Sequence, residues 1–515
     1  MTLANRIAEV AKARPRSEAL VYWRYGIREA LTFAELESQI RKAEHGFAKL
    51  GVHREETIAI LPALTPESVL AIIAAASVGI AHPINLLLSA DALKAQLLAV
   101  DAKVLVTIGV HPALDLPDLI AGMAHRPEHV IETPLTDGQP RFTPWEKFLG
   151  AYSELATPAI WTARQSFLFA TGGATSAPKI ARLNELSVLS AATNSAHRTG
   201  IDETSRVLAS LPLFHVAGLI TTVIGPLLSG AAVVLQAPFG AREPGAIENT
   251  WSLVERERIS IVSSVATTLT SLAKVPVDGR DLSSLSVIVS GASPVSVGVA
   301  QAVQTATGTP VTQMYGMTET AGTITMDDPQ DHVLGSVGKP IKGMEIRIRG
   351  GMTTGEIETR GENLFSGYLT GDSDQSAFTD DGWLKTGDLG RIGAEGELYI
   401  TGRAKDLIIR SGHNIDPIGI EDVALAHPAI ALAAAIGMPD DYAGELPVVY
   451  VELIAGACHS ADELCKWIAD RVIEPPARPK RLFILDKLPM TAVGKVFKPE
   501  LRKTAADWVE INSTS

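Results

Sequence analysis

Short apolar runs recur along this chain between residues 57 and 315, and most are separated by segments with helical periodicity. The runs are Thr57–Leu61, Val104–Ile108, Ser166–Ala170, Arg206–Ser210, Ala232–Leu235, Ile259–Ser263, Ser286–Ser290 and Val311–Tyr315. Each reads as a short buried strand. Strands that alternate with helices are typical of α/β domains with largely parallel sheets. The sequence therefore predicts an α/β fold.

At 515 residues the chain is too long for a single hydrophobic core, so we expect two or more domains. The residue composition and pattern change after about Gly335. Glycines then come every few residues, and three short β-type runs predict a smaller, mainly antiparallel layer. These runs are Glu345–Ile348, Gly355–Thr359 and Glu397–Ile400. Helical patterns return at Gly419–Ala426 and Asp462–Val472. We expect a large N-terminal domain of parallel-rich sheets with flanking helices and a β-layer (residues 1–402), and a small α+β C-terminal domain (residues 403–515).

Two local patterns predict helices in the first domain. Thr32-Phe-Ala-Glu35 forms a possible capping box before the amphipathic segment Leu36–Leu50. Val69–Ala81 is the most apolar stretch, but it falls short of the roughly 20 residues that a membrane-spanning helix needs, so we expect a buried helix. The amino terminus lacks the profile of a signal peptide, and we expect a cytoplasmic protein without a membrane span.

Charge and cysteine content narrow the class of protein. The net charge is −13, from 58 acidic and 45 basic residues, and no dense block of Lys and Arg occurs. This argues against nucleic acid or an anionic membrane as partner, but leaves room for a local basic pocket. Cys458 and Cys465 are too few for a disulfide framework or a zinc cluster, so we expect two reduced thiols.

One loop, Phe169–Lys179, has the composition of a phosphate-binding segment. It consists largely of Gly, Ala, Ser and Thr and ends in a lysine. Such residues let backbone N–H groups approach a phosphate, while hydroxyls and the lysine add donors and charge. It is not a Walker loop, because Pro178 and Ile180 flank Lys179. Taken alone, it fits a plain Gly/Ser turn equally well.

Five further segments carry chemistry, each of which also has a plain reading as a turn, a surface loop or a solvated charge. They are Ser290–Pro294, Gln313–Thr320, Trp383–Gly390, Gly402–Asp406 with Ile409–Asn414 behind it, and Leu488–Val496. The first two follow strands, at the edge where open α/β sheets bind nucleotides. The second offers an aromatic, a hydroxyl and a carboxylate, and the third a carboxylate suited to ribose hydroxyls. The last places Lys495 on a turn after a glycine.

The order and spacing of these segments resemble the adenylate-forming superfamily of acyl-CoA synthetases, peptide-synthetase adenylation domains and luciferases. The nearest likeness is to the fatty-acyl/aryl-CoA ligase branch. The phosphate loop, Tyr-Gly-x-Thr-Glu, Thr-Gly-Asp, Gly-Arg-x-Lys-Asp and Pro-x-Thr-x-x-Gly-Lys appear in family order between residues 171 and 495. Two positions depart from the family pattern: Ser176 and Ile180 stand where glycine is usual.

The resemblance implies a two-step reaction that uses ATP, Mg²⁺ and coenzyme A. A carboxylate attacks the α-phosphate of ATP to give acyl-AMP and pyrophosphate, and the thiol of coenzyme A then takes the acyl group. Lys495 would bridge the carboxylate and the α-phosphate. The small domain would be mobile and would turn about a hinge near Lys405, exchanging Lys495 for a loop that lines the thiol tunnel.

The resemblance also implies roles for individual residues. The β- and γ-phosphates would be held by Thr171, Gly172, Gly173, Thr175, Ser176 and Lys179. Glu319 would coordinate Mg²⁺, and Thr318 would contact the α-phosphate. The nucleoside would be bound by Tyr315, Gly316, Asp388, Arg403 and the base-pocket residues Gly291, Ala292 and Ser293. The thiol tunnel would include Ser411, Gly412 and His413.

The segment Pro212–Gly218 resembles the acyl pocket of the family. His215 would stand at its gate, followed by Val216, Ala217 and Gly218. Amino-acid-activating relatives carry an aspartate at the position of His215, which disfavours amino acids here. Ala217, Gly218, Ala292, Gly316 and Gly322 are all small, so we expect a roomy, apolar pocket for medium-chain, alicyclic or aromatic acids.

Two other functions stay open from the sequence. The enzyme could pass its acyl group to a carrier protein, although no appended carrier domain is visible. It could also be a catalytically silent acyl-nucleotide binding protein, against which the intact Lys495, Glu319 and Asp388 argue. The sequence leaves a homodimer open and does not fix the oligomeric state.

Overall fold

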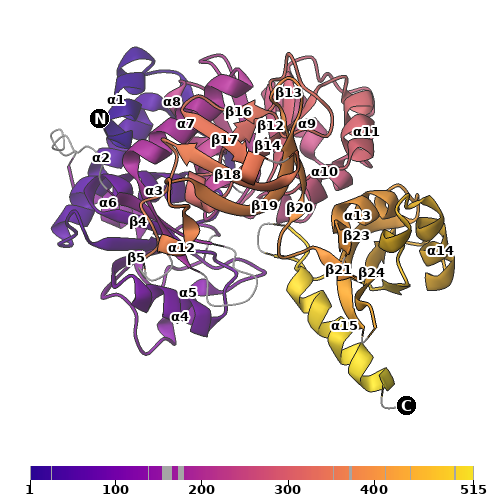
Figure 1. Cartoon of the computed structure of the whole chain (residues 1–515). Coiled ribbons are helices and arrows are strands. Elements are labelled where there is room, and N and C mark those ends of the chain that lie inside the picture. The colour runs from indigo at the N-terminus through magenta and orange to yellow at the C-terminus, as the bar shows by residue number, and fades with distance from the viewer. Residues whose placement is uncertain are drawn as a thin grey trace.

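The computed structural model describes residues 2–24, 26–136, 138–153, 165–171, 179–351, 353–369, 374–411, 413–440, 442–491 and 494–513. In Figure 1 a large body, coloured indigo to orange, carries the N-terminus, and a smaller body, coloured orange to yellow, carries the C-terminus. The expected α/β fold with a large N-terminal and a small C-terminal domain is confirmed.

Two large sheets dominate the N-terminal domain. The strands of the first are β3 (Thr57–Ile60), β4 (Ile80–Pro83), β5 (Ala102–Ile108), β6 (His129–Thr133), β7 (Thr143–Pro144), β8 (Gln165–Ala170) and β9 (Ile180–Asn184). Their order is β7-β6-β5-β3-β4-β8-β9, and neighbours are parallel except for the β8–β9 pair. The antiparallel β8–β9 pair places the expected phosphate loop, residues 171–179, between two adjacent strands.

The second sheet carries the expected nucleotide-binding edge. Its strands are β1 (Glu18–Arg24), β2 (Ile27–Thr32), β10 (Arg206–Ala209), β11 (Ala232–Leu235), β12 (Ile261–Val265), β13 (Val287–Gly291), β14 (Val311–Tyr315), β15 (Thr325–Met326) and β16 (Lys339–Pro340). They lie in the order β16-β15-β14-β13-β12-β10-β11-β1-β2. The central strands β10 to β14 are parallel, so their carboxyl ends meet at one edge, where Gly291 and Tyr315 lie.

Two smaller sheets follow along the chain. The expected β-layer is antiparallel and consists of β17 (Met344–Ile348), β18 (Gly355–Gly361), β19 (Leu384–Ile392) and β20 (Leu398–Arg403). The C-terminal domain has β21 (Ile408–Arg410), β22 (His413–Ile415), β23 (Ile430–Asp440), β24 (Gly444–Leu453) and β25 (Arg481–Ile484). Only β25 runs parallel to its neighbour, β24, among the described strands of this sheet.

The largest buried cluster lies between the two large sheets. It joins side chains of both, such as Ile58 and Val233, to the helices α1, α2, α3 and α7. The helices of the N-terminal domain are α1 (Leu3–Ala13), α2 (Phe33–Lys49), α3 (Pro66–Val78), α4 (Ala90–Ala99), α5 (Leu116–Ala121), α6 (Trp145–Gly150), α7 (Glu185–Thr199), α8 (Gly225–Leu228), α9 (Thr250–Glu257), α10 (Ala266–Leu272), α11 (Val297–Thr307) and α12 (Asp374–Ala377). Those of the C-terminal domain are α13 (Pro417–Leu425), α14 (Ala461–Arg471) and α15 (Lys498–Ser513).

The bounds of the apolar helix expected at Val69–Ala81 need correction. The buried helix is α3, which begins at Pro66 and ends at Val78. Thr65 caps it by accepting a hydrogen bond from the Ser68 amide, and Pro66 suits the first helical turn. Gly79 ends the helix, so Ala81 belongs to the buried strand β4.

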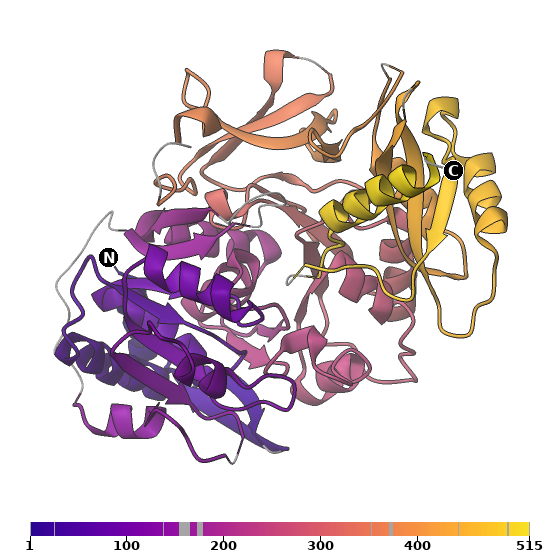
Figure 2. The same ribbon diagram turned by 90° about the horizontal axis from the view of Figure 1, so that it is seen from below.

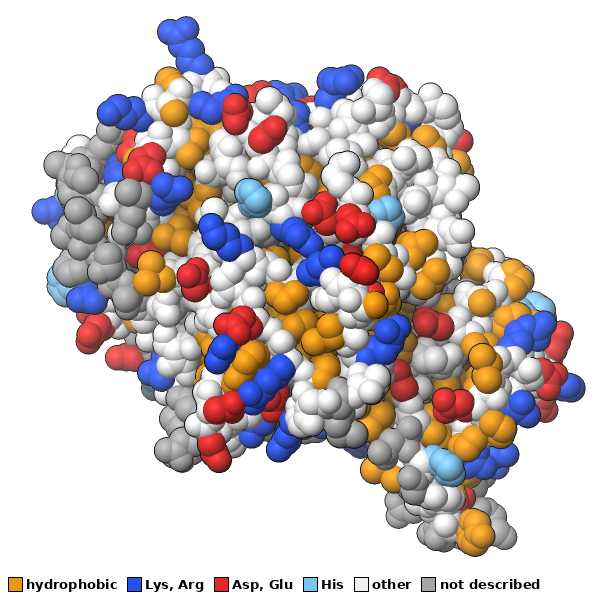
Figure 3. Space-filling view, turned by 45° about the horizontal axis from the view of Figure 1, so that its top comes forward, with side chains coloured by type: hydrophobic (Ala, Val, Ile, Leu, Met, Phe, Trp, Pro, Cys, Tyr) orange, Lys and Arg blue, Asp and Glu red, His pale blue; other side chains and the backbone are white. Residues whose placement is uncertain are grey.

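The surface and the cysteines agree with the composition. Lys and Arg side chains are interspersed with Asp and Glu on the face shown in Figure 3. Across the described ranges, every helix is too short or too polar to cross a bilayer. Both cysteines are free: Cys458 is exposed, and Cys465 lies in α14.

The capping box at the start of α2 is confirmed and can be tested. The Thr32 hydroxyl accepts from the Glu35 amide, and the Glu35 carboxylate accepts from the Thr32 amide at 2.8 Å. Thr32→Ala should cost about 1 kcal/mol of local stability, so the first amides of α2 should exchange hydrogen roughly fivefold faster. Thr32→Ser keeps the hydroxyl and is the matched control. Equal exchange in both variants would contradict the capping role.

Candidate functional site

The ends of the phosphate loop are fixed by the β8–β9 pair. The Thr171 amide donates to the Lys179 carbonyl at 2.7 Å, which closes the loop at its base. The Lys179 ammonium lies 4.8 Å from the centre of the Tyr368 ring. Gly172, Gly173, Thr175 and Ser176 lie outside the described residues. The structure therefore places the lysine of the loop beside an aromatic ring that the sequence pattern did not single out.

Tyr368 connects this lysine to the expected magnesium ligand. Its hydroxyl donates to Oε1 of Glu319 at 2.7 Å. Thr318 and Glu319 lie on a short 3₁₀ turn, Thr318–Thr320, which directly follows the end of β14. Lys179, Tyr368 and Glu319 thus form one chain of contacts, although they come from three separate segments. The only local signal for Tyr368 is weak: it is an aromatic residue directly after a glycine.

A second cluster joins Tyr315, Asp388 and Arg403. The Tyr315 hydroxyl donates to Oδ2 of Asp388 at 2.8 Å, and Nε of Arg403 donates to Oδ1 at 2.6 Å. The pairing of β19 with β20 places Asp388 directly opposite Arg403, which explains why two distant motifs meet. Burial and the charge of Asp388 raise the pKa of Tyr315 well above its usual value. The Tyr315 hydroxyl therefore stays protonated and acts as a donor.

The small-residue turns beside this cluster are closely packed. A Cβ on Gly291 would lie 2.6 Å from Cγ of Met314, and one on Gly316 would lie 2.3 Å from the carbonyl oxygen of Gly322. Ala292 has a φ of +70°, a region that non-glycine residues rarely adopt. Ser293 follows in the same turn and is partly buried. Both glycines are required for close approach, and the turn at Ala292 is strained.

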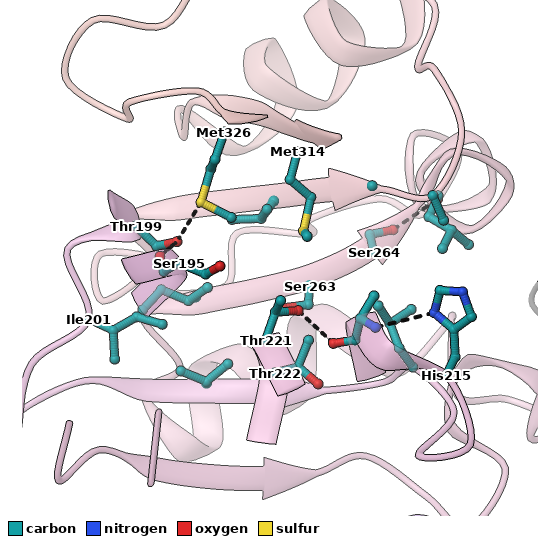
Figure 4. Close-up of a pocket in the computed structure, with 18 of the residues that line it drawn as sticks. Ser195, Thr199, Ile201, His215, Thr221, Thr222, Ser263, Ser264, Met314 and Met326 are labelled. Carbon is teal, nitrogen blue, oxygen red and sulfur yellow. Dashed lines mark hydrogen bonds between the residues drawn. The ribbon is translucent and has the colours of Figure 1, made fainter. Parts of the chain in front are cut away.

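A cavity lies against this turn. In Figure 4 His215 lies at one end, and Ser195, Thr199 and Ile201 lie toward the other. Its walls come from α7, from the carboxyl-end half of β12 and from the π-helix Ala217–Ile224. The expected pocket residues His215, Ala217 and Ala292 line it, as do Gly291 and Met314.

Other expected pocket residues lie outside the lining. The Val216 side chain packs in the main core, and a Cβ on Gly218 would lie 2.1 Å from the Pro212 carbonyl oxygen. The lining instead includes hydroxyl groups that the sequence did not indicate, from Ser195, Thr199, Thr221, Thr222, Ser263 and Ser264. Thr221 and Thr222 each donate at 2.5 Å to a carbonyl one turn earlier. These two hydroxyls therefore face the cavity mainly as hydrogen-bond acceptors.

The cavity is uncharged. Burial, and secondarily the charge of Lys495, lowers the pKa of His215 to about 4, so this imidazole is neutral near pH 7. The Ala217 amide donates to its Nδ1 at 3.3 Å. No Lys, Arg, Asp or Glu occurs among the described residues that line the cavity. A bound group would therefore meet apolar walls and neutral polar atoms.

Lys495 lies on a turn of the small domain that reaches the large domain. The charge of Lys495 affects the pKa of His215, and the charges of Arg403 and Asp388 affect the pKa of Lys495. The four side chains therefore lie in one region. Burial first, and then the charge of Arg403, lower the pKa of Lys495 to about 8, while Asp388 opposes the shift. The structure thus brings together three expected site groups: Lys495, the cluster of Tyr315, Asp388 and Arg403, and His215 at the end of the cavity.

The expected hinge and tunnel residues follow β20 along the chain. Lys405 is exposed on the turn after β20. Ser411 has a φ of +49° and donates its amide to the Ala443 carbonyl at 2.7 Å, within the small domain. His413 begins β22 and pairs with Arg410. Gly412 lies outside the described residues.

The sequence as a whole matches known proteins along almost its entire length. The family model described as AMP-binding enzyme matches residues 7–369, and the model described as AMP-binding enzyme C-terminal domain matches residues 419–495. The chain belongs to the AMP-binding enzyme family. The expected membership of the adenylate-forming superfamily, on its CoA-ligase branch, and the expected acid–thiol ligase class are confirmed.

Individual relatives span the same length. Marinolic acid–CoA ligase of Pseudoalteromonas sp. (strain SANK 73390) is 32% identical, with 97% of this chain and 81% of the relative covered. 2-Succinylbenzoate–CoA ligase of Bacillus subtilis (strain 168) is 31% identical over 97% of each chain. A solved structure of o-succinylbenzoate CoA synthetase from Bacillus subtilis, in complex with its acyl-adenylate intermediate, superposes with a TM-score of 0.82 at 30% identity and covers 97% of this chain and 98% of its own.

The buried carboxylate of Asp388 should stabilise the folded large domain. Asp388→Ala removes the acceptor of the buried Tyr315 hydroxyl and the partner of Arg403. We expect the free energy of unfolding of the large domain to fall by about 1–3 kcal/mol, measured by urea titration. Asp388→Asn keeps an acceptor oxygen and should lose less, and Asp380→Ala at an exposed position should lose little. An unchanged midpoint in Asp388→Ala would refute this interpretation.

Proposed function

We propose that this AMP-binding enzyme is an ATP-dependent acyl-CoA synthetase. In the first step a carboxylate oxygen forms a bond to the α-phosphorus of ATP, the bond to the bridging oxygen breaks, and pyrophosphate leaves. In the second step the sulfur of coenzyme A bonds to the acyl carbon, AMP leaves with the former carboxylate oxygen, and the thiol proton passes to solvent. Both steps depend on positioning and charge neutralisation more than on a protein nucleophile.

The observation that carries this proposal is the placement of Lys495. Burial lowers the pKa of this lysine to about 8. Its side chain reaches the region where the cluster of Tyr315, Asp388 and Arg403 meets His215, at the end of the neutral cavity. Asp388, the nearby carboxylate that acts on it, is already bonded to Tyr315 and Arg403. We infer that the ammonium pairs with the substrate carboxylate and the α-phosphate, between which charge moves in the first step.

The remaining ATP contacts follow the same geometry. We assign the β- and γ-phosphates to the loop that starts at Thr171 and ends at Lys179, and the α-phosphate contact to Thr318. Asp388 and Arg403 would bind the ribose, and Tyr315, Gly316 and the turn Gly291–Ser293 the base. The described residues contain no group of three or more His, Cys, Asp or Glu side chains that could hold a metal. A Mg²⁺ ion held by Glu319 and the substrate phosphates fits this donor set, because Mg²⁺ commonly binds through one or two carboxylates plus phosphates and would neutralise phosphate charge.

The second step requires Lys495 to leave. We propose that the small domain, residues 403–515, turns about a hinge near Lys405 relative to residues 1–402. This motion would withdraw Lys495 and bring the loop Ser411–His413 to the thiol tunnel. The left-handed backbone of Ser411, which is strained for a serine, supports a loop built for a particular placement.

The neutral pocket supports an acid with an uncharged acyl group. We propose a monocarboxylic medium-chain, alicyclic or aromatic acid, because the cavity offers apolar walls and hydroxyl acceptors but no cation among its described lining residues. A second carboxylate would be buried without a partner there, which costs several kcal/mol. The acceptor character of Thr221 and Thr222 further favours tails that carry a hydrogen-bond donor, such as a hydroxyl group.

The substrate proposal is tested by pyrophosphate release with a panel from acetate to palmitate, with benzoates and cyclohexane acids, with and without coenzyme A. We expect octanoate to exceed octanedioate in kcat/KM by roughly 10-fold or more, because the dicarboxylate buries an unpaired charge. Acyl-CoA should form only when coenzyme A is added. Equal use of the two acids would refute the neutral pocket. AMP formation that ignores coenzyme A but needs a carrier protein would refute the ligase.

The role of Lys495 is tested by separating the two steps. Lys495→Ala should slow acyl-AMP formation by roughly 100-fold or more, because it removes a preorganised charge. The same variant should still convert preformed acyl-AMP and coenzyme A into the thioester. Equal loss of both steps would refute this role.

The pH dependence of acyl-AMP formation tests the same role of Lys495 in the unmodified enzyme. Lys495 acts as a cation, so its contribution is present below its pKa of about 8 and is lost as the pH rises through that value. The kcat/KM of acyl-AMP formation, which reports the free enzyme, should therefore fall above about pH 8. In Lys495→Arg any remaining activity should lack this fall.

A further inference from the structure

We propose that Arg242 and Thr267, two side chains of the large domain, hold the turn that carries Lys495 and so act as positioning residues for the first half-reaction. The inference rests on the proposed function for its catalytic consequence. Its structural basis is independent of that function, because it consists of two hydrogen bonds that cross from one domain to the other. Figure 2 shows the yellow segment before α15 reaching from the small domain toward the large one.

The first of these bonds comes from α10. The Thr267 hydroxyl donates to the Gly494 carbonyl at 2.8 Å. Gly494, which precedes Lys495, has a φ of +81°, and a Cβ on it would lie 3.3 Å from Oγ1 of Thr267 and 3.5 Å from Cγ2 of Val265. The turn is therefore seated closely against the junction of β12 and α10. Val265 also lines the acyl cavity, so the seat and the cavity share a wall.

The second bond comes from the loop after β11. Nη2 of Arg242 donates to the Thr491 carbonyl at 2.6 Å. Arg242 ends a short 3₁₀ turn that starts at Gly240, where a Cβ would lie 2.1 Å from the Ser210 carbonyl oxygen. The loop is thus fixed against the end of β10. Surrounding protein lowers the pKa of the Arg242 guanidinium by desolvation, with no carboxylate among the causes of the shift.

Hydrogen bonds among the described residues of the turn connect both attachment points to Lys495. The Thr491 amide donates to the Lys495 carbonyl at 2.7 Å, and the Lys495 amide donates to the Thr491 hydroxyl at 3.0 Å. The Gly494 amide donates to the Thr491 carbonyl at 3.0 Å. Residues 492 and 493 lie outside the described part of the chain. The large domain therefore grips the turn at Thr491 and Gly494, at its start and directly before the lysine.

Two points of attachment fix orientation as well as distance. One bond alone would let the turn pivot, whereas bonds at both ends hold the backbone from which the Lys495 side chain leaves. A misplacement of about 1 Å in a reacting group can cost roughly 100-fold in rate. Both bonds must break when the small domain turns for the second step. Arg242 and Thr267 should therefore assist acyl-AMP formation and leave thioester formation unaided.

The variants Thr267→Val and Arg242→Met test this proposal, and each has a matched control. Thr270→Val lies on the same helix, but its hydroxyl donates to the Ala266 carbonyl within α10. Arg471→Met removes an exposed arginine that donates to the Trp467 carbonyl within the small domain and makes no described contact with the Lys495 turn. The first two variants should slow acyl-AMP formation about tenfold each, and thioester formation from preformed acyl-AMP should stay within about twofold. Both controls should match the unmodified enzyme in both steps.

Hydrogen exchange of the turn provides a readout that needs no activity. In the protein without substrates, amides of Thr491, Gly494 and Lys495 should exchange several-fold faster in Thr267→Val and Arg242→Met than in the controls. A loosened turn would also expose the Lys495 ammonium to water, which raises its pKa. The pH at which the kcat/KM of acyl-AMP formation falls should therefore increase from about 8. A merely structural role would leave that pH unchanged.

Three results would overturn the proposal. Unchanged exchange in both variants would mean that the bonds do not hold the turn, whatever the enzyme's substrate. Equal loss of both half-reactions would indicate general damage. A selective loss of thioester formation in Arg242→Met would assign Arg242 to the incoming thiol substrate. Failure of the proposed function is a separate outcome, in which the exchange differences persist but the unmodified protein forms acyl-AMP with no acid.

Discussion

The positive charge of one side chain, Lys495, constrains which charged groups can lie around it. An ammonium partly removed from water is costly unless an anion pairs with it, and the drop of its pKa to about 8 records that cost. The nearby carboxylate of Asp388 is shared with Arg403 and Tyr315. The site is therefore short of negative charge at the point where Lys495 arrives. Under the proposed function, a substrate carboxylate and a phosphate would supply this negative charge.

The neutrality of the adjoining cavity follows from the same constraint. A cation inside that cavity would compete for the substrate carboxylate, and an anion there would pair with Lys495 directly. His215 satisfies both conditions, because burial and the approach of Lys495 lower its pKa to about 4 and leave it uncharged. The hydroxyls of Thr221 and Thr222, which donate to carbonyls of their own helix, add polar atoms but no charge to the wall.

The sequence predicted those features that depend on neighbours along the chain: strand positions and the Thr32 cap rest on local periodicity and turn chemistry. The family resemblance assigned Asp388 and Arg403 to one nucleoside site, but their direct contact was not predicted. The sequence did not indicate the contacts of Tyr368, Thr267 and Arg242, because their partners lie 49, 227 and 249 residues away along the chain. A lone Thr or Arg carries no sign of such a partner. The helix bounds at Val69–Ala81 were misplaced for a related reason: apolar residues continue from α3 into β4, and only Gly79 separates them.

Small residues illustrate a further limit on reasoning from composition to pocket shape. Gly218 and Gly316 suggested a roomy cavity, yet a Cβ at either position would collide with a backbone carbonyl, so both are used for close packing. The wall of the cavity includes an unusual helix instead. The segment Ala217–Ile224 is a π-helix, a wider and rarer coil that is common at functional sites. Thr221 and Thr222 of this helix line the cavity, while Gly218 lets the helix start against Pro212. The glycine thus contributes to the pocket through backbone placement, and replacing it by alanine would displace the helix before it altered the cavity volume.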